Sequence, residues 1–172
     1  MIFGWFARKR APISEMLHAE LVAAARRPVF YAELGVPDTV DGRFEMLCLH
    51  LFLFLRRGRT EPALEELAQE VLDRTFADLD RNLREAGVGD LSVPKKMKRL
   101  AGRFYARVNL YAPPLDAGDA EAIATALRRT ALTDNPDGDA PRLAHYIIRA
   151  GAGLAAQPAD RLLAGTIAFP HP

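Results

Sequence analysis

This sequence of 172 residues has one cysteine, no cluster of histidines and little net charge. The single cysteine, Cys48, cannot form an intramolecular disulfide and agrees with a reducing compartment. The histidines, His18, His50, His145 and His171, lack the close spacing with cysteine or carboxylate that a metal site needs, so we expect no metal ion and no cofactor. The net charge is +1 at pH 7, so any electrostatic function must come from local patches.

Catalytic motifs are also missing. No Ser–His–acid order lies in a motif context, and the glycines of residues 87–90 lack the preceding strand and the following Lys–Ser/Thr of a phosphate-binding loop. Asp80 and Asp90 can form part of a carboxylate cluster, but pairing with arginines such as Arg84 is the simpler role. We therefore predict no catalytic residue, with an α-helical enzyme that uses Asp80, Asp90 and His50 as the alternative.

No apolar run is long enough to cross a membrane. The apolar stretch of residues 44–55 is shorter than the about 20 residues that a span needs, and it contains Glu45 and His50. A helix that is apolar on nearly every face lies at the centre of a bundle or against a partner. We interpret His50 as a hydrogen-bonded core histidine, with partner contact or haem sensing as the alternative. Cys48, in the same stretch, is interpreted as a buried, unreactive thiol.

Alternation of apolar and polar residues is never long enough for a sheet, and the 49% of apolar residues argues against disorder. The sequence therefore predicts an all-α, single-domain bundle of about six or seven helices. Prolines and capping residues suggest a helix over residues 14–27, a helical turn after it, and further helices beginning near residues 39, 62, 92, 119, 141 and 157. We expect Pro113 and Pro114 to break the chain. Residues 13–172 form the helical domain, preceded by a segment over residues 1–12.

This N-terminal segment carries aromatic residues followed by cations. A secretory signal has its basic residues first, so the order here is reversed, and the run is too short to span a bilayer. Aromatic side chains beside cations can lie at a lipid headgroup layer, whereas the alternative is a terminus that is disordered or folds back on the core. The membrane-contact residues predicted here are Phe3, Trp5, Phe6, Arg8, Lys9 and Arg10.

Residues 76–107 contain an acidic helix end, a glycine turn and a basic amphipathic helix in direct succession. Gly87 and Gly89 end the first helix, and Ser92 can cap the second. The cations of the second helix are Lys95, Lys96, Lys98, Arg99, Arg103 and Arg107. No Asp or Glu occurs between Asp90 and Asp116, so these charges have no local partner. They form either a solvated face or a binding surface for something anionic or close to a membrane.

The turn and the basic helix are the predicted partner-binding surface. We expect Asp80 and Arg84 to brace the turn, Asp90 to lie near the next helix N-terminus, and Arg103 to point outward with the lysines. The residues assigned to this surface are Asp80, Arg84, Gly87, Gly89, Asp90, Lys95, Lys96, Lys98, Arg103, Phe104 and Tyr105.

Three long strings carry a resemblance to a known family. They are DRNLREAGVGDLSVPKKMKRLAGRFYAR (80–107), PDTVDGRFEMLCLHLFLFLRR (37–57) and LAAQPADRLLAGTIAFP (154–170). Together they resemble the ubiquinol–cytochrome c chaperone family, the assembly factors of the cytochrome bc complex. The resemblance covers most of the chain from Phe30 onward.

The resemblance implies a non-enzymatic assembly chaperone. Family members bind newly made cytochrome b, the client protein, during biogenesis of ubiquinol–cytochrome c reductase (respiratory complex III). Mitochondrial relatives carry a targeting extension and act with a small partner protein. Without such an extension, this chain is expected to be a bacterial member, peripheral at the cytoplasmic face of the inner membrane. A small partner chaperone or a ribosome remains open as a further partner, and DNA is not expected.

The alternative function is a ribosome- or nucleic-acid-binding helical module that uses residues 95–107. It predicts an affinity that falls steeply with salt. Few aromatic residues are available to stack on bases, and the overall charge is close to zero.

Overall fold

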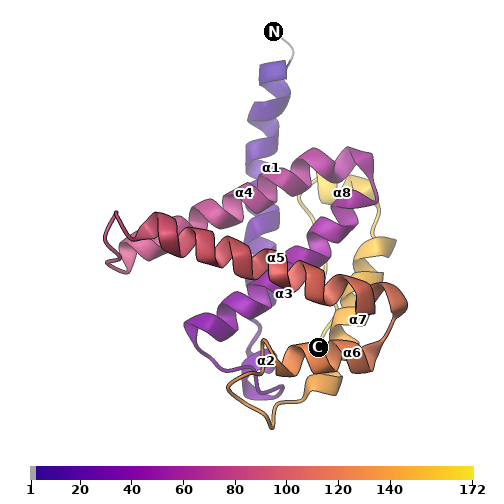
Figure 1. Ribbon diagram of the computed structural model, residues 1–172. Helices are drawn as coiled ribbons and strands as arrows, with labels where there is room; N and C mark the ends of the chain where they lie inside the picture. The colour runs from indigo at the N-terminus through magenta and orange to yellow at the C-terminus, as the bar shows by residue number, and fades with distance from the viewer. Residues whose placement is uncertain (1–2) are drawn as a thin grey trace.

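The computed structural model of the protein describes residues 3–172, with side chains from residue 12 onward. Every regular element in this part of the chain is a helix (Figure 1). The helices are α1 (Phe3–Ala25), α2 (Pro28–Ala32), α3 (Val40–Arg59), α4 (Pro62–Glu85), α5 (Val93–Ala117), α6 (Ala120–Arg128), α7 (Ala140–Ala156) and α8 (Ala159–Leu163). This confirms the predicted all-α, single-domain fold. The eight helices of the described chain include two of only five residues, α2 and α8.

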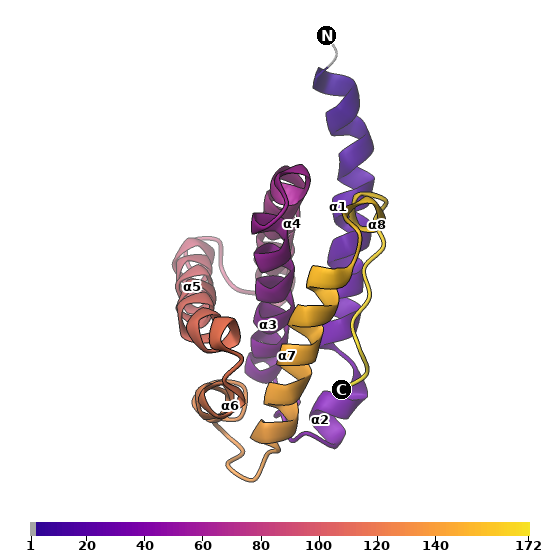
Figure 2. The same cartoon turned by 90° about the vertical axis from the view of Figure 1, so that its right-hand side faces the viewer.

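Helix α3 is the centre of the core because its side chains are apolar on nearly every face. It packs against α1, α4, α5 and α7. Figure 2 shows α3 and α4 between α5 on one side and α1 with α7 on the other. Ten of the eleven residues from Phe44 to Phe54 are buried, and Leu47 is half-buried. Among the helices that the structure describes, none combines the length and the apolar character required to traverse a bilayer.

The start of α3 is fixed by two contacts with the preceding connector. Thr39 is the N-cap, and its Oγ1 accepts a hydrogen bond from the Gly42 backbone N–H at 3.1 Å. A Cβ atom on Gly42 would lie 2.0 Å from the carbonyl oxygen of Pro37, so only glycine allows the connector to come this close.

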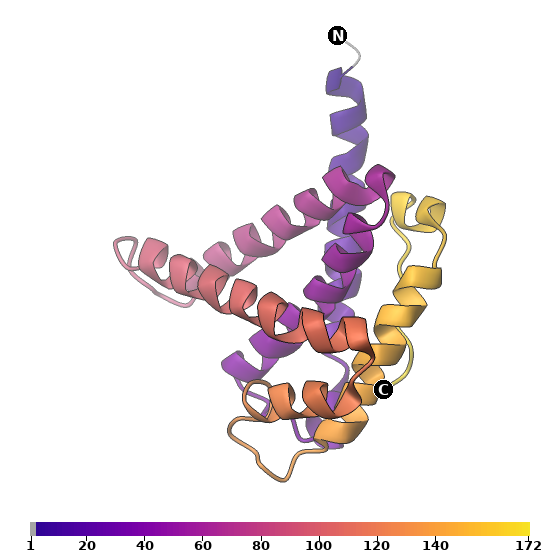
Figure 3. The ribbon, with the colours of Figure 1, turned by 45° about the vertical axis from the view of Figure 1, so that its right-hand side comes forward.

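Helices α4 and α5 form an arm that extends from the bundle, joined at its far end by residues 86–92 (Figures 1 and 3). Pro62 begins α4 as predicted, in the first turn where a missing N–H costs little. Gly87 has φ +80° and ends the helix in a left-handed conformation. Gly89 has no positive φ, and Ser92 makes no capping hydrogen bond although it precedes α5.

Two helices are longer than the sequence predicts. Helix α1 begins at Phe3 and continues through Pro12, whereas the expected start was near residue 14. Helix α5 continues through Pro113 and Pro114 and ends at Ala117, so the expected break there is wrong. The two prolines remove hydrogen bonds to carbonyls of Asn109 and Leu110, which are exposed residues whose carbonyls water can reach.

The C-terminal tail closes the core over α3. The Gln157 side chain donates to the Ala168 carbonyl (2.8 Å) and accepts from its N–H (2.9 Å). Arg27 donates to the carbonyls of Pro170 (2.5 Å) and Phe169 (3.2 Å). The Phe169 ring then packs edge-on against His50, with centroids 4.9 Å apart.

Candidate functional site

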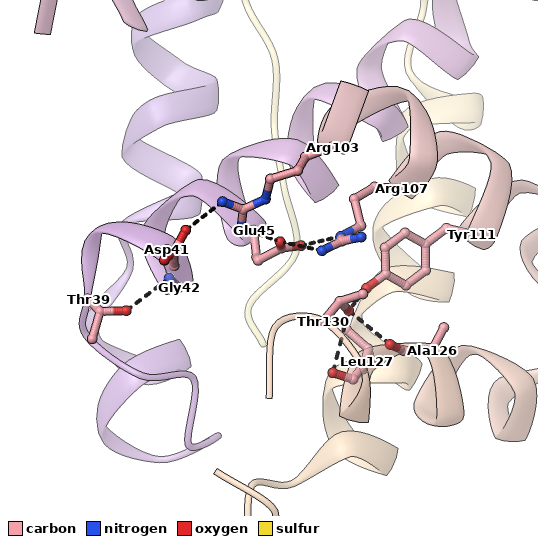
Figure 4. Close-up of polar contacts among 10 residues, drawn as sticks. All are labelled: Thr39, Asp41, Gly42, Glu45, Arg103, Arg107, Tyr111, Ala126, Leu127 and Thr130. Carbon is pink, nitrogen blue, oxygen red and sulfur yellow. Dashed lines mark hydrogen bonds and ion pairs between the residues drawn. The ribbon is translucent and has the colours of Figure 1, made fainter. Parts of the chain in front are cut away.

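Two of the arginines on α5 face inward, toward α3 (Figure 4). Arg107 donates to both carboxylate oxygens of Glu45, from Nε at 2.6 Å and from Nη2 at 2.7 Å. Arg103 donates to Glu45 at 2.9 Å and to Asp41 at 2.5 Å. The expectation that Arg103 points outward is therefore wrong. Its partners lie on α3, about 60 positions away along the chain, so the local sequence carries no sign of them.

Glu45 is a buried carboxylate whose charge must be balanced. It is 3% exposed, and an unpaired charge at such a place would be strongly destabilising. The bidentate contact with Arg107 and the second contact with Arg103 supply that balance. Hydrogen bonding to Glu45 in turn raises the pKa of Arg107. Arg103 also lies over the Phe44 ring, 4.7 Å from its centroid, so its guanidinium is held from two sides.

The contacts of its residues explain the run Gly–Arg–Phe–Glu at positions 42–45. Gly42 lets the connector approach, and Phe44 and Glu45 receive the two α5 arginines. Arg43 points the other way and pairs with Asp38 at 2.7 Å. This run is therefore the junction between α3 and α5. Sequence reasoning missed Glu45 as its centre, although a carboxylate within an otherwise apolar helix was a usable signal.

The inner end of α5 is fixed by a second contact. The hydroxyl groups of Tyr111 and Thr130 are hydrogen bonded, and Thr130 Oγ1 also donates to the Ala126 carbonyl at 2.9 Å (Figure 4). Burial raises the pKa of Tyr111, which therefore remains a neutral phenol. Helix α5 is thus attached to α3 and α6 along one face.

The remaining cations of α5 face solvent. Lys95, Lys96, Lys98 and Arg99 are exposed, and their side chains form no ion pair or hydrogen bond with any residue that the structure describes. The basic stripe therefore divides into arginines that hold the helix in place and cations that are available to a ligand.

The turn at the end of the arm is braced as predicted. Arg84 donates to Asp80 from Nε at 2.7 Å and to Asp90 from Nη1 at 2.5 Å. Hydrogen bonding to Asp80 raises the pKa of Arg84. Directly after Asp90 the chain presents Leu91, which is 99% exposed. The brace fixes the turn and leaves an apolar residue beside the unpaired lysines.

The aromatic pair on α5 is divided between core and surface. Phe104 is 1% exposed and packs edge-on against Phe76, with centroids 6.0 Å apart. Tyr105 is 55% exposed and lies on the outer face. Phe104 therefore supports the predicted surface from beneath, and Tyr105 is part of it.

His50 and Cys48 lie in the core. His50 Nδ1 donates to the Met46 carbonyl at 2.8 Å, and its Nε2 accepts from the Tyr146 hydroxyl at 2.7 Å. Burial raises the pKa of Cys48, so the thiol is not a nucleophile. Asp80 and Asp90 meet only through Arg84 on the surface, so the groups of the enzyme hypothesis do not come together.

Metal-binding clusters of three or more His, Cys, Asp or Glu do not occur among the described side chains. The six residues predicted to contact a membrane, from Phe3 to Arg10, belong to the part of α1 whose side chains lie outside the described residues.

Comparison with known proteins agrees with this architecture. A family model described as "Ubiquinol-cytochrome C chaperone" matches residues 32–169. The chain belongs to this family, so the resemblance seen in the sequence is confirmed. It is also similar to the crystal structure of the Cbp3 homolog from Brucella abortus, with 44% sequence identity, coverage of 99% of this chain and 97% of that chain, and a TM-score of 0.87. No curated protein matches the chain. Family membership supports a role as a chaperone in complex III assembly.

Proposed function

We propose that the protein is a non-enzymatic assembly chaperone that binds newly made cytochrome b during biogenesis of ubiquinol–cytochrome c reductase. One observation carries this proposal beyond family membership. The arm presents exposed Leu91 and Tyr105 together with lysines that have no partner within the described chain. A client with apolar helices and short charged loops needs a surface that is partly apolar and partly basic.

The proposed surface consists of the turn and the outer face of α5. Asp80, Arg84, Gly87 and Asp90 keep the turn in one conformation, which lowers the conformational cost of binding. Lys95, Lys96 and Lys98 supply the charge. Arg103 and Phe104 act indirectly, because they attach the helix to the core.

The place of action that we propose is the cytoplasmic face of the inner membrane, where the client is inserted. The N-terminal aromatic and basic residues would supply a peripheral contact with the lipid surface. A small partner chaperone that shares the surface fits the same proposal. The unpaired cations would also suit ribosomal RNA, so ribosome binding is the second outcome that the experiment must distinguish.

The test is a charge reversal of Lys95, Lys96 and Lys98 to Glu, followed by affinity capture from native membranes in mild detergent. Exposed substitutions usually change stability by within about 0.5 kcal/mol each, so the fold should survive. We expect the wild-type chain to capture cytochrome b and the variant to lose it.

The matched control reverses three exposed arginines elsewhere, Arg59, Arg129 and Arg161, and changes the net charge by the same amount. It should capture normally, with thermal melting to verify that both variants fold. A folded lysine variant that captures cytochrome b at wild-type levels would place the binding surface elsewhere. Ribosomal proteins in place of cytochrome b, released by salt, would favour the ribosome-binding alternative.

A further inference from the structure

An apolar groove of about 370 Å³ lies beside the arm. Its walls are the C-terminal half of α1, the first half of α3 and the last turns of α4, and Leu100 of α5 also lines it. Figures 1 and 3 show these helices around one side of the bundle, where α4 and α5 leave it. Tyr105 is not among the residues that line this groove.

Apolar side chains line most of this groove and are not fully covered. Val22, Leu47, Leu79 and Leu100 are half-buried, and Val40 is 87% exposed. A contiguous, partly open apolar surface on a soluble domain marks an interaction site. Nothing else in the described chain covers it.

The charges around the groove leave a positive excess. Asp41 is neutralised by Arg103 (2.5 Å), and Asp78 is paired with Arg81. Arg26 lines the groove on the α1 side without an ion-pair partner in the described chain. Lys96, also unpaired, precedes Leu100 by one turn on the same face of α5. The unpaired charges at the groove are therefore Arg26, in its lining, and Lys96, one turn from the lining residue Leu100.

We infer that this groove binds an apolar helix of the partner, with carboxylates near the ends of that helix. Helical walls with apolar side chains between them are the usual receptor for a helix that inserts its apolar face. Arg26 and Lys96, on separate helices, match carboxylates spaced along a helix better than a single lipid headgroup. That the helix comes from cytochrome b rests on the proposed function, whereas the chemistry of the occupant does not.

The probe is a synthetic helical peptide of about 11 leucine and alanine residues, the length of three turns, with two glutamates at each end. Binding in mild detergent is measured by fluorescence anisotropy, beside a peptide with lysines at its ends. We expect the wild-type chain to bind the glutamate peptide at least tenfold more tightly than the lysine peptide.

Two variants alter the groove without touching the core. Val40→Asp places a carboxylate at the start of α3, where the helix dipole favours it, so folding is preserved. Arg26→Glu with Lys96→Glu reverses both free cations. Each should weaken binding of the glutamate peptide at least tenfold. The matched controls are Ala152→Asp, at an exposed position of α7, and Arg59→Glu with Arg129→Glu, which should bind as the wild type does.

Equal binding by all variants would overturn the inference. So would a lipid that co-purifies with the wild type and is lost in Val40→Asp, without any peptide binding, because the occupant would then be an acyl chain. Self-association that Val40→Asp abolishes, again without peptide binding, would assign the groove to a second copy.

Capture of cytochrome b separates this inference from the proposed function. Peptide binding that depends on Val40, with no capture of cytochrome b by the wild type, would support the groove as a helix-binding site and refute cytochrome b as the client. If the wild type does not bind the peptide, and Val40→Asp captures cytochrome b as well as the wild type does, the groove is not the binding site and cytochrome b is still the client.

Discussion

At the scale of single residues, His50 shows how a polar group is accommodated in the core. It is fully buried, yet both ring nitrogens have partners, the Met46 carbonyl and the Tyr146 hydroxyl. Burial lowers its pKa to about 4, so the ring is neutral at pH 7. The sequence indicated a hydrogen-bonded core histidine from its apolar surroundings. It could not identify Tyr146, which lies 96 positions away.

We predict that His50→Ala destabilises the fold by about 3 kcal/mol at pH 7, through lost packing and unpaired partners. The deficit should shrink in acid. The histidine has a pKa of 6.5 in the unfolded chain and about 4 in the folded chain. Between these two pH values the unfolded wild-type chain binds more protons, so the stability of the wild-type protein falls as the pH is lowered. The alanine variant lacks this loss. Urea unfolding of both proteins from pH 7 to 4 measures the difference, and a deficit that is constant with pH would contradict the buried neutral ring.

At the scale of elements, α5 has two faces with different tasks. One face is attached to α3 and α6 through Arg103, Arg107 and Tyr111, and the other presents unpaired cations. The sequence predicted the helix and its basic stripe correctly, because periodicity is a local property. It could not predict which of these cations form ion pairs, because the partner carboxylate, Glu45, lies on another helix and comes close only in the folded protein. The same limit explains Phe104, whose neighbour Phe76 lies across the arm.

Glu45→Gln tests how much the junction between α3 and α5 contributes to the stability of the fold. Replacing the buried carboxylate by a neutral amide leaves the partly buried Arg107 without its counter-charge and Arg103 with Asp41 alone, and we expect a loss of about 3 kcal/mol. Asp41→Asn is the matched control, because Asp41 is 70% exposed and pairs with the same Arg103. Exposed ion pairs contribute less than about 1 kcal/mol, so this variant should be close to wild type. Equal losses in urea unfolding would show that burial of Glu45 is not the cause.

At the scale of the whole molecule, composition and periodicity were sufficient for the all-α class and for the central place of α3. They were not sufficient to predict how the helices cross one another. The groove beside the arm is made by side chains from four helices, and no single segment of the sequence marks it. Helix α1 also begins earlier than the predicted start near residue 14 and continues through Pro12.

The N-terminal segment is predicted to serve membrane association and not folding. In Figures 1 and 3 the first turns of α1 extend past the other helices. Deleting residues 1–10 should therefore leave the melting temperature nearly unchanged. Binding to anionic liposomes should weaken, because each basic residue near such a surface contributes about 1 kcal/mol. A variant with glutamine at positions 8, 9 and 10 separates the cations from the aromatic residues. Liposome binding that survives the deletion intact would refute the role.

The hydrogen bond between His50 and Tyr146 has a consequence during synthesis of the chain. The two residues are 96 positions apart, and a ribosome adds about 5 to 20 residues per second. Helix α3, the most apolar segment, is therefore translated about 5 to 20 s before the residue that completes its polar contact. During that interval α3 lacks the cover of α7, the last of its neighbouring helices to be made, so the nascent chaperone is itself exposed to aggregation in the way that its proposed client is.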